Sequence, residues 1–395
     1  MAEHVAAGYM TRFQCAGTAC EDTCCKAWDV PISQADYGRL AGALGADADD
    51  LVTRVANGRG GSIVVLRKLA DRACPALDGA GLCSVHARFG ETALPDVCAS
   101  YPRVIGQLGD RLELTGRMSC PEVARLVLLA DDGALVPATR EPFGRENVRL
   151  SLAREGAPPY FAAFETVRDA IVELCVTDEF PFASRLYFVA ELATRLAPFY
   201  HREATIAEPE RLAGVIAEVR DGRAELHAKR LASSAMDGLA LESVIGMLYA
   251  RADASPAFAA LVRKNAAVHG ASDLAGLTAI GPEPLWQTHL ARRGAHAEQL
   301  DRYAARYSQN YWLQDWFPVS ETLFEHLMHL ALRVALVRFL LVGHPEFGTD
   351  SAAVEVFYAT SRAYDHNPEV RAALSHTLRK RGMLTVAHCA ALLTL

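Results

Sequence analysis

The chain has 395 residues, of which 51% are hydrophobic and 22% are charged. This length allows one large domain or two, and the composition is that of a globular protein rather than a disordered one. The formal net charge is -7 and the lysines and arginines are scattered. A nucleic-acid-binding protein usually carries a basic stripe, so we expect no nucleic-acid partner.

The first ten residues, MAEHVAAGYM, lack the charged start and the unbroken apolar core of a signal peptide. The most hydrophobic segment, residues 324–342, is long enough to span a bilayer but contains Glu325, Arg333 and Arg338. Charges at mid-membrane are costly, so the segment is predicted to be a buried helix. We therefore expect a cytoplasmic protein, while association with a membrane surface stays open.

The first 125 residues contain many loop signals and few regular elements. Ser33 is predicted to cap a helix over residues 35–44. Two strand-like stretches, SIVVLRKL and RLEL at residues 111–114, predict a hairpin or small sheet behind the cysteines. Ser119 is predicted to cap a further helix, which opens with Cys120 and Pro121 and continues as PEVARLVLLA.

After residue 145 the sequence changes to a succession of helices. Apolar residues recur with a period of 3.6 in eight segments, namely 160–176, 182–196, 208–232, 239–250, 256–269, 298–307, 319–342 and 352–363. The predicted fold class is therefore mainly α. A cysteine-rich metal- or cluster-binding region with little sheet spans residues 1–125, and a helical domain, expected to bind the substrate, spans residues 126–395.

Eight of the ten cysteines lie in the first 120 residues, namely Cys15, Cys20, Cys24, Cys25, Cys74, Cys83, Cys98 and Cys120. Cys175 and Cys389 are predicted to be isolated core thiols. A cytoplasmic location argues against a disulfide scaffold. The four cysteines of CAGTACEDTCCKAW lie among charged residues and cannot all be core, so the eight are predicted to bind a metal or a cluster.

The cysteine spacing favours iron–sulfur over zinc. A zinc site usually contains C-x2-C pairs, and this chain has none. Spacings of three, four, eight and fourteen residues are looser, as iron–sulfur ligation allows. Cys120-Pro121 is also similar to the Cys-Pro that closes ferredoxin runs. The sequence leaves open which four cysteines hold a given cluster and whether one or two clusters form.

Three stretches carry a resemblance to a known family: CAGTACEDTCCKAW, CPALDGAGLCSVHARFGETALPDVCASYPRV and SCPEVARL. Over residues 13–125 they resemble the flagellin lysine-N-methylase (FliB) family, and the cysteine pattern is similar to YkgJ-type cysteine-cluster proteins. Beyond residue 125 the resemblance is one of general layout. It implies methyl transfer from S-adenosylmethionine to a lysine ε-amine, with a [4Fe–4S] cluster held by the cysteines.

Generic cofactor motifs are missing from the chain. The glycines of NGRGGSIVVL precede the strand-like stretch, whereas a dinucleotide-type fold places them after it. The radical-S-adenosylmethionine spacing C-x3-C-x2-C is also missing, because Cys24 and Cys25 are adjacent. Any S-adenosylmethionine site therefore lies elsewhere, and a radical and a polar mechanism both stay open.

Four residues near Cys98 and Cys120 are candidates for the chemistry. Arg103 and Arg117 could bind the carboxylate of the cofactor bidentately, and Arg103 could also act at the catalytic site. Tyr101 and Glu122 could orient or deprotonate an amine, since a lysine ammonium must lose a proton before it attacks. Ordinary ion pairs or surface positions are the alternative for each.

The remaining polar features carry weaker signals. His86 could ligate a metal or lie beside one, and the helical pair His326 and His329 is expected to be structural. The aromatic residues of YSQNYWLQDWF could line a substrate groove or pack in the core, and Asn310 and Asp315 are the polar residues there to watch.

Two functions follow from this pattern. The first is an iron–sulfur, S-adenosylmethionine-dependent lysine N-methyltransferase acting on flagellin, another protein or a small amine, with an electron donor as a further partner. The second is a non-catalytic iron–sulfur or zinc module on a helical binding domain. The sequence does not set the oligomeric state.

Overall fold

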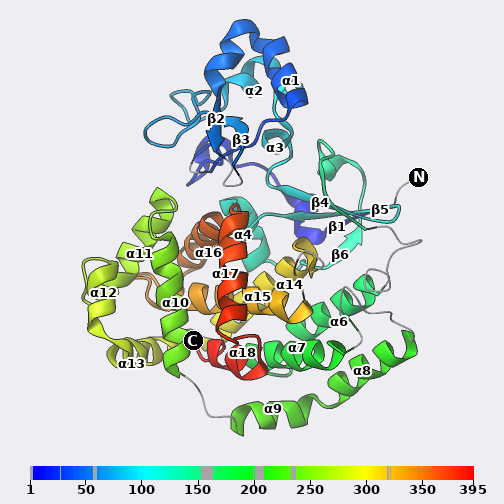
Figure 1. Ribbon diagram of the computed structural model, residues 1–395, viewed down its shortest axis with the longest axis vertical. Coiled ribbons are helices and arrows are strands. Elements are labelled where there is room, and N and C mark those ends of the chain that lie inside the picture. Colours follow the sequence, from blue (N-terminus) through cyan, green and yellow to red (C-terminus); the bar gives the residue numbers. More distant parts are fainter. Residues whose placement is uncertain are drawn as a thin grey trace.

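The computed structural model describes residues 3–26, 28–56, 60–152, 163–198, 200, 209–232, 237–317, 320 and 322–395. A small lobe stands at one end of the molecule, above a sheet and a large assembly of helices (Figure 1), and contains α1 (Gln34–Leu44), β2 (Val52–Ala56), β3 (Ser62–Leu66), α2 (Ser84–Phe89) and α3 (Asp96–Ser100). Each of the two parts has its own hydrophobic cluster.

The small lobe is held together by short elements around a compact apolar cluster. Ser33 caps α1 as predicted: its side chain accepts from the Asp36 N–H, and the Asp36 carboxylate accepts from the Ser33 N–H. Val30, Leu40 and Leu66 are among the residues buried at its centre.

A five-stranded sheet lies between the lobe and the helices, in the order β6-β1-β5-β4-β7. Its strands are β1 (Glu3–Ala7), β4 (Arg103–Leu108), β5 (Arg111–Gly116), β6 (Leu135–Pro137) and β7 (Val148–Leu152). Strands β4 and β5 form an antiparallel hairpin, whereas β1 runs parallel to β5 and β7 parallel to β4. Both predicted strands exist, but they lie in different sheets, because β3 pairs with β2.

The rest of the described chain is helical. The helices are α4 (Pro121–Leu129), α6 (Phe164–Val176), α7 (Phe182–Leu196), α8 (Pro209–Asp221), α9 (Arg223–Ala232), α10 (Asp237–Arg251), α11 (Pro256–Val268), α12 (Leu274–Ile280), α13 (Pro282–Arg293), α14 (Ala297–Gln314), α15 (Leu323–Val342), α16 (Asp350–Tyr364), α17 (Pro368–Lys380) and α18 (Val386–Leu392). The predicted fold class, mainly α with a cysteine-rich N-terminal region and little sheet, is confirmed.

Each of the eight predicted helical segments falls on a helix, although residues 160–162, 208, 319 and 321 lie outside the described residues. The segment 208–232 forms two helices that meet at Gly222. The apolar periodicity did not predict helices α12, α13, α17 and α18 of the helical part. The two shortest, α12 and α18, are seven residues long, too short for a periodic pattern to identify them.

Helix α15 forms the centre of the helical part and is buried along its whole length. Its charges are paired inside the protein: Arg333 lies 3.0 Å from Asp365, Arg338 lies 3.3 Å from Asp301, and Glu325 lies 2.8 Å from Arg379. These pairs explain how a segment of near-transmembrane hydrophobicity carries charges in a buried helix. Among the described residues, the search for a helix suited to crossing a membrane finds none.

The aromatic stretch of α14 packs in the core. Tyr307, Tyr311 and Trp312 are buried, and Asn310 joins three elements through its amide. The Tyr9 hydroxyl donates to Asn310 Oδ1 (2.5 Å) and accepts from the Gly116 N–H (2.8 Å), while Asn310 Nδ2 donates to the Gly116 carbonyl (3.2 Å). Asn310 therefore fastens α14 to the sheet.

The buried residues of β1, β4, β5 and α4 belong to the same hydrophobic cluster as the helices, whereas the cluster of the small lobe is drawn from residues 30–99. The domain boundary at residue 125 stays a prediction.

Replacing Gly106 in β4 with alanine should destabilise the protein. An added Cβ would lie 2.4 Å from Trp316 Cζ2, and Trp316 is buried against Phe164. Overpacking of this kind costs roughly 1–3 kcal/mol, so the free energy of unfolding in urea should fall by that amount. Gly246→Ala in α10 is the matched control, because nothing lies within 4 Å of its Cβ. Equal stability of the two variants would contradict this packing.

Candidate metal centre

All eight N-terminal cysteines line one cavity of about 570 Å³. The cavity lies where the small lobe meets the start of α4 and the end of α16, and Tyr101, Arg103 and Glu122 also line it. Arg117 does not, and lines a second cavity instead. Thiols spread over a hundred residues of sequence are therefore brought to one place, as the prediction of a shared centre requires.

Four of the thiols form an inner group: Cys25, Cys74, Cys83 and Cys98. Cys74 belongs to the hydrophobic cluster of the small lobe and the other three pack against it, and the Cys74 N–H donates to the Cys25 carbonyl at 2.9 Å. Burial raises the pKa of Cys98, and the neighbouring charges of Cys25, Cys74 and Cys83 raise it further. The four thiols therefore face a common space.

The outer group comprises Cys15, Cys20 and Cys120, on the side of the helical part. Cys120 packs against the large hydrophobic cluster. Burial raises the pKa of Cys120 to about 11, and the charges of Cys20 and Cys15 add to this rise. Cys24 lies between the two groups. Its side chain is hydrogen-bonded to the Cys25 thiol, and its charge also acts on Tyr101.

Two of the cysteines stand at helix starts. Cys83 is the N-cap residue of α2 and Cys120 that of α4. The free N–H groups at a helix start stabilise negative charge, and those of Glu122 and Val123 oppose the rise in the pKa of Cys120. The prediction that Ser119 caps α4 is wrong: the cap position is Cys120, and the Ser119 hydroxyl lies 3.0 Å from the Tyr101 hydroxyl and 2.7 Å from His366 Nε2.

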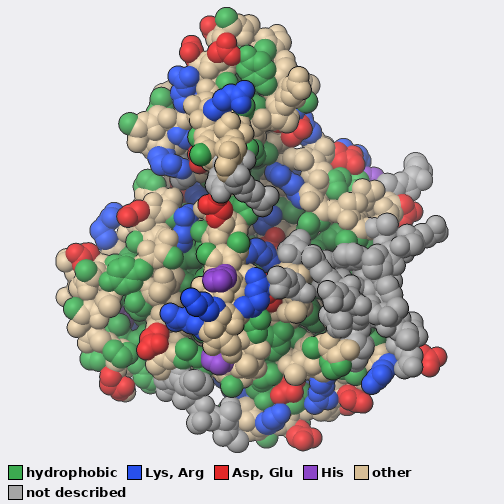
Figure 2. Space-filling model, in the orientation of Figure 1, with side chains coloured by type: hydrophobic (Ala, Val, Ile, Leu, Met, Phe, Trp, Pro, Cys, Tyr) green, Lys and Arg blue, Asp and Glu red, His purple; other side chains and the backbone are tan. Residues whose placement is uncertain are grey.

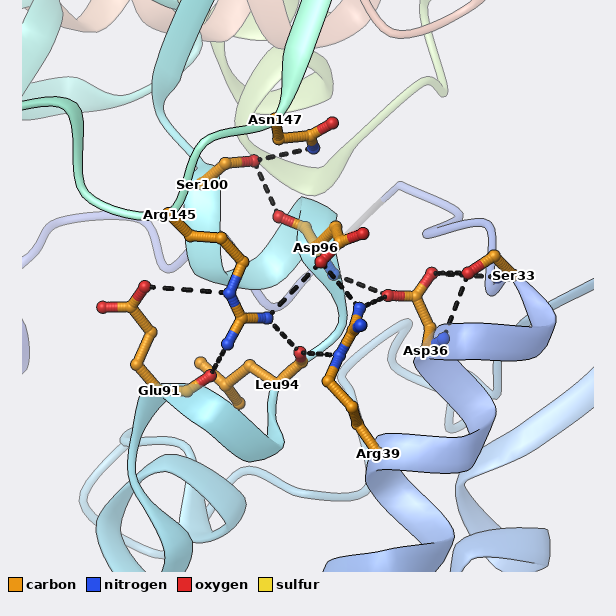
Figure 3. Close-up of polar contacts among 9 residues, drawn as sticks. All are labelled: Ser33, Asp36, Arg39, Glu91, Leu94, Asp96, Ser100, Arg145 and Asn147. Carbon is orange, nitrogen blue, oxygen red and sulfur yellow. Dashed lines mark hydrogen bonds and ion pairs between the residues drawn. The ribbon is translucent and has the colours of Figure 1, made fainter.

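A polar network surrounds the start of α3, the helix that carries Cys98 (Figure 3). Arg39 of α1 pairs with Asp36 at 2.5 Å and with Asp96, the first residue of α3, at 2.6 Å. The Asp96 N–H also donates to Asp36 (2.7 Å). Burial would raise the pKa of Asp36, but hydrogen bonds from Ser33 and Asp96 outweigh it and the pKa is lowered. The network fixes the start of α3, which carries Cys98.

The spacing of the thiols bears on the kind of metal centre that they fit. Within the described residues, no three His, Cys, Asp or Glu side chains gather tightly enough to hold one metal ion. A single zinc ion draws four sulfurs to about 2.3 Å from itself, whereas a polynuclear cluster spreads its ligands over a larger space. The eight thiols around the cavity of about 570 Å³ are soft donors that fit zinc, copper(I) or an iron–sulfur cluster.

Arg362 of α16 joins the helical part to both cysteine segments. Its guanidinium donates to the carbonyls of Asp22 (3.1 Å), Thr23 (3.2 Å) and Ser119 (3.0 Å), and it pairs with the Asp22 carboxylate at 2.6 Å. The side chain is buried and also lines the thiol cavity. It therefore sets the position of Cys24 relative to Cys120 and places a permanent positive charge beside the thiols.

The predicted catalytic residues have distinct surroundings. Burial raises the pKa of Tyr101, so its hydroxyl stays protonated at neutral pH and can donate a hydrogen bond. Arg103 donates to the Pro142 carbonyl (2.7 Å), and Glu122 pairs with Arg125 at 2.5 Å. Arg117 pairs with Asp315 at 3.1 Å. The roles predicted for these four residues stay predictions.

The histidines and remaining cysteines are placed as follows. His86 lines the thiol cavity. His326 Nδ1 lies near Ser320 and Arg371, whereas His329 Nε2 lies 2.9 Å from Ser375, so the two rings have different partners and do not form a metal pair. Cys175 and Cys389 are buried away from the cavity, which confirms them as isolated core thiols.

Sequence reasoning missed Arg362 and Lys68. Lys68 Nζ donates to the Cys25 carbonyl (3.2 Å) and its charge opposes the rise in the pKa of Cys98. Neither residue lies in a recognisable motif. Arg362 is separated from Thr23 by 339 residues, and no local signal could have connected them.

These features define a helical protein that carries a cysteine-lined centre for a metal or cluster. Comparison with known families agrees. Residues 168–392 match the FliB lysine N-methylase C-terminal domain, and residues 14–121 match a domain, CxxCxxCC, for which zinc or iron chelation has been suggested. The first match covers more than half of the chain, which therefore belongs to the FliB lysine N-methylase family.

Individual relatives match shorter stretches. The chain is 28% identical over 146 residues to the flagellar biosynthetic protein FliU of Salmonella muenchen, covering 35% of this chain and 85% of that protein. It is 29% identical over 130 residues to a lysine-N-methylase of Salmonella typhimurium, covering 30% of this chain and 31% of the relative. The chain thus spans about a third of that enzyme. No solved structure matches.

Replacing Arg362 with alanine should loosen the centre from the helical part. The change leaves the Asp22 carboxylate and three carbonyls without their donor, so we expect the free energy of unfolding to fall by about 2–4 kcal/mol. Metal retained after gel filtration should fall as well. The exposed Arg195→Ala, whose ion pair with Glu218 spans 3.6 Å, should cost less than about 1 kcal/mol. Similar losses in both variants would refute the anchoring role.

Proposed function

We propose that this protein is an iron–sulfur, S-adenosylmethionine-dependent N-methyltransferase that acts on lysine side chains. The observation that carries the proposal is the cavity that collects all eight N-terminal cysteines together with Tyr101, Arg103 and Glu122. Membership of the FliB lysine N-methylase family supports the reaction type.

The division of the thiols supports two [4Fe–4S] clusters. The inner group supplies four thiols in or against the hydrophobic cluster of the small lobe, and four cysteine ligands complete a cluster of this type. The outer group supplies Cys15, Cys20 and Cys120, with Cys24 beside them. A cluster held by three thiolates keeps one iron open, and when bound it would supply a redox-active iron next to the substrate.

The surrounding side chains are proposed to bind and orient the reactants. A lysine ammonium must lose a proton before its nitrogen can attack in a polar mechanism. Glu122, which lines the cavity together with Asp22 and Glu91, is proposed to accept that proton, and the protonated Tyr101 hydroxyl would orient the amine through a donated hydrogen bond. Arg103 and Arg117 are proposed to bind the carboxylate of S-adenosylmethionine.

The substrate class follows from the relatives. One relative is named a flagellar biosynthetic protein and two are named lysine-N-methylases, so flagellin is the proposed protein substrate, with another protein or a small amine as alternatives. Reductive chemistry would also need an electron donor.

Figure 2 shows acidic and basic side chains interspersed on one face of the molecule, without a continuous basic stripe there. A cytoplasmic location is part of the proposal.

Anaerobic purification followed by iron and acid-labile sulfide analysis tests the clusters. Two [4Fe–4S] clusters predict about eight irons and eight sulfides per chain. Cys98→Ser and Cys120→Ser should each lose about half of this content, while the core control Cys175→Ser should lose none. Zinc without sulfide would overturn the iron–sulfur assignment.

The methyltransferase activity is tested with S-adenosylmethionine, a reductant and a lysine-containing flagellin peptide, and the methylated product is measured by mass spectrometry. Removal of a general base typically lowers the rate about 10²- to 10⁴-fold, so Glu122→Gln should do so without changing the iron content. The exposed Glu298→Gln should behave as wild type. If the cluster is present but no substrate is methylated, the protein is the non-catalytic metal or redox module instead.

A further inference from the structure

A second cavity, of about 460 Å³, adjoins the thiol cavity. The two cavities share Trp28, Tyr101 and Arg103 as lining residues. The wall between them is aromatic, because Trp28 stacks on His366 at 4.6 Å and lies 5.6 Å from Tyr101. A ligand in the second cavity would therefore lie directly beside the thiols.

This cavity carries excess positive charge. Five arginines and three aspartates line it, namely Arg103, Arg117, Arg149, Arg333, Arg371, Asp29, Asp315 and Asp365. Two of the arginines are neutralised by carboxylates of the cavity: Arg117 pairs with Asp315 at 3.1 Å and Arg333 with Asp365 at 3.0 Å. Arg371 donates to Ser320 and His326, so its charge is not cancelled in this way.

Arg149 of β7 differs from the other arginines of the cavity. Among the described residues, the structure gives its side chain no hydrogen bond and no ion pair, and the side chain is exposed to the cavity. Partial burial lowers the pKa of Arg149 and the charge of the neighbouring Arg117 lowers it further, while the charge of Asp96 opposes the shift. A guanidinium group that lines a cavity and has no carboxylate partner is a favourable site for an anion.

The same arginines also act on His366, the histidine that lines the cavity. Burial lowers the pKa of His366 to about 3, and the charges of Arg117, Arg362 and Arg149 contribute to this shift. The ring is therefore neutral at physiological pH and offers an apolar face. Arginines on one side and an aromatic wall on the other suit a ligand that combines a carboxylate with a ring system.

We infer that the second cavity binds the amino-acid end of S-adenosylmethionine, and that Arg149 binds its carboxylate together with Arg103 and Arg117, which line the same cavity. This inference rests on the proposed function. The aspartates of the cavity favour this ligand over an acidic peptide, because S-adenosylmethionine also carries an ammonium and a sulfonium group that carboxylates attract. The shared wall then directs the sulfonium toward the thiols.

The test is calorimetric titration of the cluster-loaded protein, kept anaerobic, with S-adenosylmethionine and with its decarboxylated analogue. Loss of a hydrogen-bonded carboxylate typically weakens binding about 10- to 100-fold. Wild type should therefore bind the analogue that much more weakly. Arg149→Ala should bind S-adenosylmethionine about as weakly as wild type binds the analogue, and should discriminate little between the two ligands. Arg149→Lys, which keeps the charge but not the fork of donors, should be intermediate.

The control is Arg140→Ala, an exposed arginine that lines neither cavity and pairs with Glu146 at 3.2 Å. It should bind S-adenosylmethionine as wild type does. Equal affinities of wild type for the two ligands, or full affinity in Arg149→Ala, would overturn the site while leaving the proposed function intact. Absence of S-adenosylmethionine binding to wild type would overturn the proposed function and this site together.

Discussion

The contact between Arg362 and the two cysteine segments is the constraint on which the rest of the site depends. One buried guanidinium from α16 binds the carbonyls of residues 22, 23 and 119 and the carboxylate of Asp22. A planar group with five fixed donors can satisfy several acceptors at once, which a lysine cannot do. Without Arg362, these contacts would no longer hold the backbone near Cys20 and Cys24 against the backbone next to Cys120.

The two thiol groups differ in what surrounds them. The inner group is enclosed by apolar residues of the small lobe, where uncompensated negative charge is expensive. The outer group lies beside Arg362, Tyr101 and Glu122, where polar side chains can act on a ligand. This contrast is typical of proteins in which a closed centre stabilises a fold and an open one performs chemistry.

Local patterns predicted most of the long helices and the grouping of the eight N-terminal cysteines. Helices with a long apolar stripe, such as α7 and α15, could be located because their periodicity is a property of the segment itself, and the cysteines could be grouped because of their density. Short α12 and α18 lacked such a signal. The Arg362 contacts, the division of the thiols and the accessible Arg149 depend on tertiary contacts between distant residues. No single sequence records these.

The long sequence separation of the Arg362 contacts has a consequence for biosynthesis. The thiols leave the ribosome within the first 120 residues, whereas the cation that fastens them follows 243 residues after Ser119. During that interval the thiols of the nascent chain lack Arg362, which lines their cavity in the folded protein. Contacts that close such long loops form late in folding. A metal or cluster of the proposed kind would therefore be inserted either after the chain is complete or into a cavity whose wall is still incomplete.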